Sequence, residues 1–257
     1  MLKFMENLAK EAGTMALEQR KHLSAASLHF KNERDLVTDV DRLVENFIKT
    51  KIAERFPDHA IFAEESGISQ SASSEYLWII DPIDGTTSFV HDMPFYSVSI
   101  GLHRNGKPYA GAIYAPRLDE LYSAELGKGA TLNGTPIHVS ARDSLVNCLA
   151  GTGFACLRAG LKENNLKHFC RIAPQIRDIR RDGSAALDMA FVAAGRVDFF
   201  WEMLLQPYDI AAGEIIILEA GGKVTDFQGG DKYPVERGIV ASNGIIHDRV
   251  LEQLALD

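Results

Sequence analysis

The sequence predicts a layered α/β sandwich, in which helices and β-sheets alternate. Three observations predict this fold class. Amphipathic helical segments open the chain, apolar strands and apolar helical segments alternate in its second half, and several strands end beside acidic or polar residues. Because α/β proteins bind ligands at the ends of strands, the same pattern predicts a polar cleft between the layers.

Two amphipathic helices are expected at the start of the chain. Apolar residues recur at helical spacing from Leu2 to Ala16. The second helix begins near Thr38, a predicted N-cap, with Asp41 three residues later as a variant of the capping box. Its apolar face runs through Val40, Leu43, Val44, Phe47, Ile48, Ile52 and Phe56.

Short strands follow these helices. A strand over 60–63 ends at Glu64, and a polar, serine-rich loop covers 69–75. Further strands are expected over 77–80, 96–102, 108–114 and 121–124, with a hairpin over 127–135 that turns at Asn133-Gly134.

From about Ser144 the pattern changes to alternating strands and helices. Strands are expected over 149–153, 197–201, 223–227 and 239–241, and helices over 162–173, 184–194, 209–220 and from Ile245 onward. This change predicts two halves. Residues 1–143 form an α+β half, and residues 144–257 form an α/β half.

Composition and charge restrict the classes of protein to consider. The chain has 257 residues, of which 46% are hydrophobic, and its formal net charge is −8. That charge argues against general affinity for nucleic acid or an anionic membrane. No apolar run approaches the roughly 18 residues of a membrane span. Because charges such as Lys3 and Glu6 interrupt the first apolar segment, we expect that this segment is not a signal peptide. With three cysteines that lack metal-ligand spacing, we expect a cytoplasmic protein.

A pair of aspartates at the end of a buried strand is the strongest functional signal. The apolar run 77–80 leads into Asp81 and Asp84, with Pro82 expected to stop the strand. Buried carboxylates must be neutralised, and Mg²⁺, which takes oxygen ligands, suits this pair and the Ile83 carbonyl. The following segment, Gly85-Thr86-Thr87, fits a phosphate cradle at a helix start. An Asx turn that caps the next helix is the alternative.

Two further carboxylates follow the same pattern. Glu64 also follows an apolar strand, and Asp209 precedes a helical segment. A carboxylate at a helix start is favoured by the helix dipole without any metal, so Asp209 alone is weak evidence for a metal site. Taken together, the four carboxylates suit a site that holds two or more Mg²⁺ ions against a phosphate ester.

These motifs resemble those of the inositol monophosphatase family of Mg²⁺-dependent, lithium-sensitive sugar phosphatases. The matching segments are 81–87 with Phe89, 201–203, 207–213, 35–38 with Asp41, 64–66 and 181–186. Their order and spacing extend the resemblance from about Leu8 to Asp248. The resemblance implies an αβαβα sandwich of the inositol monophosphatase and fructose-1,6-bisphosphatase type, and a homodimer.

The resemblance also implies which residues hold the metals. One Mg²⁺ is expected on Glu64, Asp81 and the Ile83 carbonyl, and a second on Asp81, Asp84 and Asp209. A third, weaker ion is expected near Glu64, which gives two to three ions per site.

Catalytic and substrate-binding roles follow from the same resemblance. The Thr86 hydroxyl, paired with Asp41, resembles the family's dyad that orients the attacking water, and Glu64 is counted with them as catalytic. Substrate contacts are expected at Gly85, Thr86, Gly183, Ser184, Ala185, Glu202 and Asp209.

Three positions depart from the family pattern. Cys156 falls about where many relatives have a serine near the substrate ring, Ser88 replaces an asparagine, and Tyr208 replaces a tryptophan. None of them removes a metal ligand. Because a thiol is a poor hydrogen-bond partner, Cys156 weakens the prediction of a particular alcohol.

A group of arginines is open to two interpretations. They form either a basic lip for an anionic substrate or salt bridges and an interface patch, and we favour the second. These residues are Arg177, Arg180, Arg181 and Arg196.

The expected reaction is Mg²⁺-dependent hydrolysis of a small polyol or sugar phosphate, with myo-inositol 1-phosphate as the leading substrate. Phosphomonoester hydrolysis has a very high intrinsic barrier, and positioning with cation stabilisation lowers it. Fructose 1,6-bisphosphate, histidinol phosphate and 3′-phosphoadenosine 5′-phosphate are alternative substrates. A regulatory protein that binds the transcription machinery is the non-enzymatic alternative.

Overall fold

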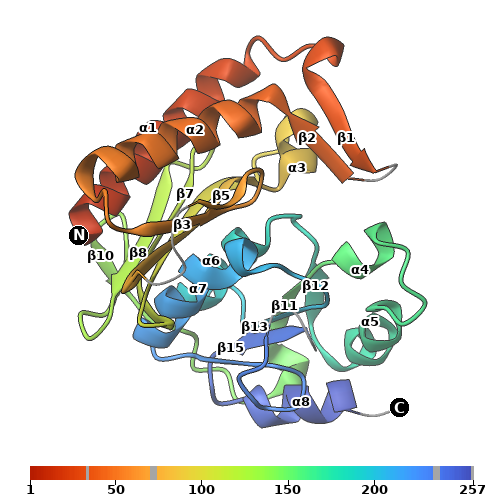
Figure 1. Ribbon diagram of the computed structural model, residues 1–257. Helices are drawn as coiled ribbons and strands as arrows, with labels where there is room; N and C mark the ends of the chain where they lie inside the picture. The colour runs from red at the N-terminus through yellow and green to blue at the C-terminus, as the bar shows by residue number, and fades with distance from the viewer. Residues whose placement is uncertain (33–34, 70–73, 234–237, 256–257) are drawn as a thin grey trace.

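The computed structural model of the protein forms five layers in the order αβαβα (Figure 1). It describes residues 1–32, 35–69, 74–233 and 238–255. Two N-terminal helices cover one face of an eight-stranded sheet, and two central helices separate it from a five-stranded sheet. Further helices cover the outer face of the second sheet. The layered α/β sandwich predicted from the sequence is therefore confirmed.

The N-terminal layer is built on a capped helix. The Thr38 hydroxyl accepts the N–H groups of Val40 and Asp41, and the Asp41 carboxylate accepts the Thr38 N–H at 2.9 Å. This confirms the predicted capping box. The hairpin before Thr38 was not predicted. The elements of this layer are α1 (Leu2–Arg20), β1 (Leu28–Asn32), β2 (Asp35–Thr38) and α2 (Asp39–Arg55).

The larger sheet has the strand order β10-β9-β8-β7-β6-β5-β3-β4. Its strands are β3 (Ala60–Ala63), β4 (Gly67–Ser69), β5 (Tyr76–Asp84), β6 (Ser97–Arg104), β7 (Lys107–Ala115), β8 (Glu120–Glu125), β9 (Ala130–Leu132) and β10 (Thr135–Ile137). Asn133 and Gly134 have φ angles of 50° and 79°, which confirms the tight β9–β10 turn. Much of the loop expected over 69–75 lies outside the described residues.

Strand β5 continues through Pro82 to Asp84, so the prediction that Pro82 stops the strand is wrong. The pairing of β5 with β6 is irregular between Asp81 and Asp84. A bulge tolerates proline, because the residue there need not donate to the neighbouring strand. Gly85 then has a φ of 94°, and the short helix α3 (Thr86–Val90) begins.

The central layer brings the second half of the chain onto this sheet. Helices α6 (Ala185–Ala193) and α7 (Pro207–Glu219) are apolar on nearly all sides, as expected between two sheets. Glycines on β6 and β7 let α7 approach closely. A Cβ at Gly101 would lie 2.7 Å from the Ala211 Cβ, and one at Gly111 would lie 2.7 Å from the Ala212 carbonyl oxygen. This packing fixes the start of α7 against the sheet.

The second sheet has the order β12-β11-β13-β15-β14. Its strands are β11 (Leu149–Thr152), β12 (Asp178–Arg180), β13 (Phe199–Glu202), β14 (Lys223–Thr225) and β15 (Ile239–Ser242), and the remaining helices are α4 (Ala155–Arg158), α5 (Leu166–Ile172) and α8 (His247–Ala255). The helix expected over 162–173 is shorter, and α4 and β12 were not predicted, because elements of three or four residues show no periodicity.

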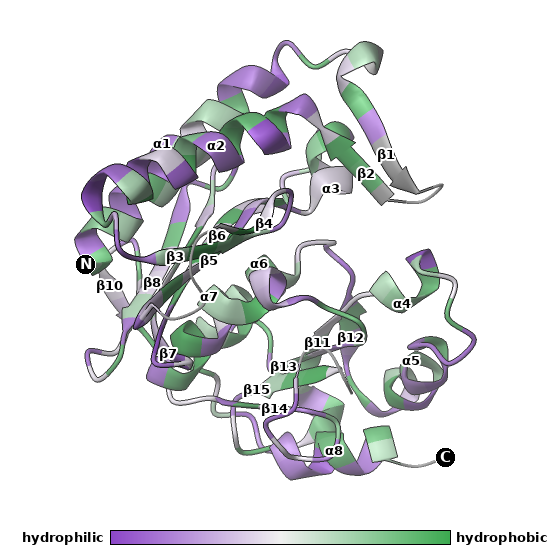
Figure 2. Ribbon diagram, in the orientation of Figure 1, coloured by the Kyte–Doolittle hydropathy of each residue, from purple (hydrophilic) through white to green (hydrophobic). Residues whose placement is uncertain are grey.

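Apolar side chains fill the spaces between the layers. Figure 2, which colours the ribbon by hydropathy, shows hydrophobic stretches in green on strands and helices of these layers. Trp78 in the larger sheet and Trp201 in the smaller are fully buried.

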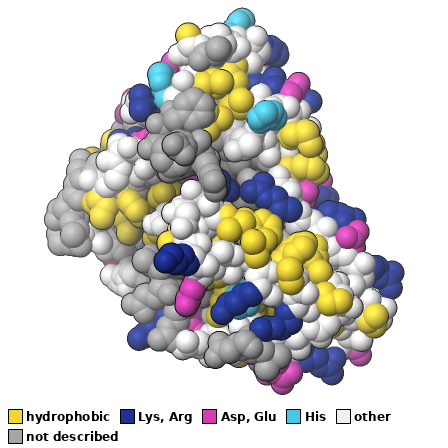
Figure 3. All heavy atoms as spheres, turned by 90° about the vertical axis from the view of Figure 1, so that its right-hand side faces the viewer, with side chains coloured by type: hydrophobic (Ala, Val, Ile, Leu, Met, Phe, Trp, Pro, Cys, Tyr) yellow, Lys and Arg dark blue, Asp and Glu magenta, His cyan; other side chains and the backbone are white. Residues whose placement is uncertain are grey.

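On the face shown in Figure 3, Lys and Arg side chains are interspersed with apolar and acidic ones. Among the described helices, none is both long and apolar enough for a membrane crossing. The division into halves at 143/144 stays a prediction.

Candidate functional site

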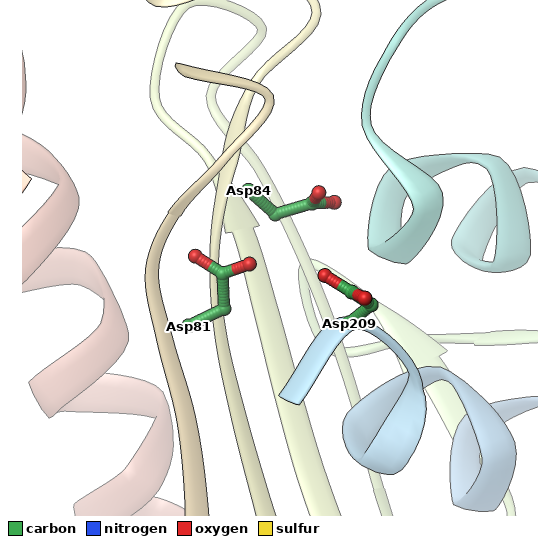
Figure 4. Close-up of side chains that lie close together, drawn as sticks. All are labelled: Asp81, Asp84 and Asp209. Atoms are coloured by element: carbon green, nitrogen blue, oxygen red, sulfur yellow. The ribbon is translucent and has the colours of Figure 1, made fainter. Parts of the chain in front are cut away.

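Three aspartates from two elements converge at one point (Figure 4). Asp81 and Asp84 come from the end of β5, and Asp209 comes from the first turn of α7. One carboxylate oxygen of each lies within 4.8 Å of the others. Asp81 is 2% exposed and Asp84 is 7% exposed. The predicted convergence of the strand motif with Asp209 is therefore present in the structure.

Hydrogen bonds from neighbouring backbone and side chains orient the three carboxylates. Asp84 Oδ2 accepts the Ser184 hydroxyl at 2.5 Å and the Ala186 N–H at 2.7 Å. Asp81 Oδ1 accepts the Ile83 N–H at 3.0 Å, and Asp209 Oδ2 accepts the Gln206 N–H at 2.6 Å. Helix α6 is thereby joined to β5 at the cluster. These bonds leave a group of anionic oxygens directed at a shared space.

Burial and mutual repulsion make this cluster unfavourable as a set of bare anions. Burial raises the pKa of Asp84 to about 6, and it raises the pKa values of Asp81 and Asp209 well above the usual range. Repulsion from neighbouring carboxylates, Glu64 among them, raises all three further. A hard divalent cation would relieve both effects, and carboxylate oxygens are the ligands it prefers. The donor set therefore fits Mg²⁺.

Glu64 and Ile83 lie beside this cluster. Glu64 follows β3, and its N–H donates to the Ile80 carbonyl on β5 at 3.2 Å, which holds the two strand ends together. It lines the same cleft as the aspartates, but it lies outside the group of three within 4.8 Å. The Ile83 carbonyl accepts the Thr86 hydroxyl at 3.2 Å.

The hydrogen bond expected between Thr86 and Asp41 is present. The Thr86 hydroxyl donates to Asp41 Oδ1 at 3.2 Å, whereas Asp41 Oδ2 accepts the Thr38 N–H and hydroxyl groups. Asp41 is thus fixed by the capping box of α2 and presents its other oxygen to Thr86. Burial raises the pKa of Asp41 to about 6.

A cleft of about 340 Å³ joins the acidic cluster to the second sheet. Among its lining residues are Glu64, Asp84, Gly183, Ser184, Ala185, Glu202 and Asp209. A smaller adjoining cleft of about 90 Å³ is lined by Asp81, Ile83, Gly85, Thr86 and several of the same residues. The predicted site residues on both halves of the chain therefore face connected space, with Asp41 directly behind Thr86.

Glu202 ends β13 and lies deep in the larger cleft. It is 5% exposed, and its Oε1 accepts the Ala155 N–H at 2.9 Å. Burial raises the pKa of Glu202 to about 7. A Cβ at Gly153 would lie 2.0 Å from Glu202 Oε2, so the glycine is needed for the carboxylate to fit.

Two predictions about residues near the site need correction. Cys156 is fully buried and its sulfur accepts the Asn165 N–H at 3.3 Å; Ala155, not Cys156, lines the cleft. Arg181, which we assigned to a salt bridge or an interface, lines both clefts. Of the other arginines, Arg180 pairs with Asp178 and Arg196 pairs with Glu120, as favoured from the sequence.

Sequence reasoning missed two charged residues of the larger cleft, Arg158 on α4 and Asp188 on α6. Arg158 had no detectable signal, since α4 is too short to predict. Asp188 could have been found from the sequence, because it is the single charged residue in the apolar segment 185–193.

The raised pKa of Asp84 gives a testable pH dependence for chelator-treated protein. The folded state holds a proton on Asp84 up to about pH 6, whereas the unfolded chain releases it near pH 3.8. The folded state therefore binds more protons between these values, and stability falls as pH rises through them. We expect a loss on the order of 1–3 kcal/mol relative to Asp84→Asn. Thermal melts from pH 4 to 8 test this; a wild-type Tm that rises relative to the variant would contradict it.

The fold and site together define a class of protein. It is a five-layer αβαβα protein with a candidate divalent-metal centre where the larger sheet meets a central helix. The chain belongs to the inositol monophosphatase family, whose model matches residues 1–256.

Relatives of known name and structure cover nearly the whole chain. It is 38% identical to the inositol-1-monophosphatase of Mesorhizobium japonicum over 252 residues, which make up 98% of this chain and 95% of the relative. It is 39% identical to Nus factor SuhB of Pseudomonas aeruginosa over 247 residues, 95% and 91% of the two chains. The solved structure of an inositol monophosphatase from Anabaena (Nostoc) matches with a TM-score of 0.89 at 41% identity, covering 98% and 94%.

Proposed function

We propose that the protein is a Mg²⁺-dependent phosphatase that hydrolyses a small polyol or sugar phosphomonoester, with myo-inositol 1-phosphate as the leading substrate. The observation that carries this proposal is the acidic cluster, with Asp81 and Asp84 buried and Asp209 half-buried, beside a cleft lined by both halves of the chain. Family membership and the similarity to an inositol-1-monophosphatase support it.

The residues that would hold the metal are those of the acidic cluster and its neighbours. They are Glu64, Asp81, Asp84, Asp209 and the Ile83 carbonyl. When bound, Mg²⁺ lowers the pKa of coordinated water and offsets negative charge on the phosphoryl group. The proposed stoichiometry is two to three ions per site.

Thr86 and Asp41 would orient the attacking water. Because the Thr86 O–H donates to Asp41 Oδ1, the lone pairs of the Thr86 oxygen remain to accept a hydrogen bond from water. The raised pKa of Asp41, about 6, places its carboxylate within the range of an effective proton acceptor near neutral pH. We therefore assign Thr86, Asp41 and the adjacent Glu64 to water positioning and proton transfer.

The substrate would lie across both clefts. Its phosphate group would be held by the backbone of Gly85 and Thr86 at the start of α3. Its alcohol would contact 183–185, Glu202 and Asp209 in the larger cleft. Carboxylates there suit hydroxyl donors, which is why a polyol is favoured.

A substrate panel tests the proposal directly. Purified protein with Mg²⁺ is assayed for phosphate release from myo-inositol 1-phosphate, fructose 1,6-bisphosphate, histidinol phosphate and 3′-phosphoadenosine 5′-phosphate. We expect the highest kcat/KM for the inositol ester. A preference for another ester would replace the leading substrate, and no release from any of them would overturn the enzymatic proposal.

Replacing Glu202 with glutamine is expected to raise KM for the polyol ester by about 10-fold, with metal affinity nearly unchanged. Glutamine keeps an acceptor for the Ala155 N–H but loses the charge that a substrate hydroxyl would meet. Steady-state kinetics and Mg²⁺ titration measure the two effects separately. Unchanged KM values across the panel would contradict the contact assigned to Glu202.

A second candidate function is regulatory binding to the transcription machinery. The similarity to Nus factor SuhB of Pseudomonas aeruginosa favours it, and it is compatible with catalysis. Binding of wild-type protein and Asp84→Asn to purified bacterial RNA polymerase would separate the roles. Binding that persists in the inactive variant supports an independent role, and absence of binding argues against it.

The resemblance implies further properties, which we propose on that ground. They are a homodimer, inhibition by lithium and a cytoplasmic location. Sedimentation analysis and lithium titration of the activity test the first two.

A further inference from the structure

Asp188 is a buried carboxyl group that the proposed reaction does not yet use. It lies on α6, is 2% exposed and lines the larger cleft. Its Oδ1 has no hydrogen-bond partner among the described residues. Burying a polar oxygen without a partner is costly, so a native structure that keeps one calls for an explanation.

Two glycines at the end of β11 lie against carboxyl groups of the cleft. Gly151 and Gly153 lie two residues apart and so share one face at the end of β11. A Cβ at Gly151 would lie 3.3 Å from Asp188 Oδ1, and one at Gly153 would lie 2.0 Å from Glu202 Oε2. Each glycine therefore faces one carboxyl group of the same cleft.

Helix α6 connects Asp188 rigidly to the acidic cluster. Ser184, the N-cap of this helix, accepts the Leu187 N–H and donates to Asp84 at 2.5 Å. Asp188 follows one turn later on the same face. Its distance from the cluster is thus set by a short, capped and fully buried helix.

The cationic side chains of the cleft do not neutralise Asp188 by direct pairing. Arg158 and Arg181 line the same cleft, yet within the described part of the chain neither forms an ion pair with Asp188. Burial raises the pKa of Asp188 well above its usual range. Repulsion from Asp182 and Glu202 raises this pKa further, and Arg181 lowers it.

We propose that Asp188 joins Glu202 in a two-carboxyl cradle that binds hydroxyl groups of the leaving alcohol. The cradle, defined as these two carboxyl groups with Gly151 and Gly153 behind them, would favour esters of polyols over esters of alcohols that lack further hydroxyl groups. This inference rests on the proposed function and adds Asp188 as a determinant of substrate class.

Two esters and two variants test the cradle. Wild type, Asp188→Leu and Asp188→Asn are assayed with myo-inositol 1-phosphate and with p-nitrophenyl phosphate, whose alcohol has no further hydroxyl. We expect Asp188→Leu to lower the preference for the inositol ester, as a ratio of kcat/KM values, by on the order of 10- to 100-fold, mainly through KM. Asparagine keeps polar atoms at the site and should retain part of the preference.

The ratio of kcat/KM values for the two esters distinguishes a substrate-binding role of Asp188 from a purely structural one. Equal losses for both esters, or an unchanged ratio in either folded variant, would overturn the role of Asp188. If Asp188→Leu fails to fold, the ratio for Asp188→Asn decides alone. Glu214→Gln is the matched control, because Glu214 is a buried carboxylate bonded to Tyr233 at 2.6 Å and lines neither cleft; its ratio should stay that of the wild type.

A binding measurement separates this inference from the proposed function. Saturation-transfer NMR with free myo-inositol should show binding to the wild type and weaker binding to Asp188→Leu. Wild-type protein that hydrolyses neither ester would contradict the proposed function alone, since polyol binding still tests the cradle. Equal binding of myo-inositol by wild type and variant would contradict the cradle alone.

Discussion

Asp84→Asn is expected to abolish phosphatase activity and the stabilisation of the protein by Mg²⁺, while the fold stays intact. Asparagine keeps a carbonyl oxygen for the Ser184 hydroxyl and the Ala186 N–H, so the junction of β5 with α6 retains an acceptor. It removes one negative charge from the three-aspartate cluster, and with it a ligand that Mg²⁺ prefers. We expect turnover to fall on the order of 10³-fold or more, as for loss of several kcal/mol of transition-state stabilisation.

Thermal melts of chelator-treated protein measure the metal effect independently of activity. At a Mg²⁺ concentration of about 100 times Kd, wild type should gain about 2.7 kcal/mol of stability. Asp84→Asn should gain little, and the control Glu214→Gln should respond as wild type does. An Asp84→Asn protein that keeps both its Mg²⁺ response and its activity would refute the assignment of Asp84.

Thr86→Ala is expected to lower kcat by on the order of 10²- to 10³-fold with little change in Mg²⁺ affinity. The single hydrogen of the Thr86 hydroxyl lies between two acceptors, Asp41 Oδ1 and the Ile83 carbonyl, whose oxygens are each 3.2 Å from the Thr86 oxygen. Alanine leaves both acceptors in place but removes the oxygen that would orient water. Steady-state kinetics with Mg²⁺ titration separate the loss of turnover from any loss of metal.

Thr86→Ser is the matched variant, because it restores the hydroxyl without the methyl group. It should recover most of the turnover. Parallel losses of turnover and Mg²⁺ affinity in Thr86→Ala, or no recovery in Thr86→Ser, would mean that Thr86 acts through the metal site or through packing.

The sequence predicts those parts of the site that depend on residues close together in the chain. Thr38 and Asp41 could be paired from capping chemistry, which depends only on residues three apart. Asp81 and Asp84 could be placed at a strand end from the apolar run before them. That Asp209 meets them depends on close packing of α7 against the sheet; the shared pattern of the four carboxylates suggested it, and the family resemblance implied the ligand set.

The errors concern features set by tertiary context. Proline stops a regular strand, but the irregular pairing near Asp84 lets β5 pass through Pro82. Cys156 and Ala155 are neighbours in the sequence, and only the path of α4 decides that Ala155 faces the cleft. Arg181 looked like one of several surface arginines, because no local sequence pattern shows that it lines the cleft.

The most direct measurement is a crystal structure of the protein soaked with Mn²⁺ as an anomalous scatterer in place of Mg²⁺. We predict an anomalous peak among the carboxylates of Asp81, Asp84 and Asp209, and loss of that peak in Asp84→Asn. A fully occupied Mn²⁺ elsewhere in the molecule, with no peak among these three aspartates, would contradict the central claim that the buried cluster is a metal centre.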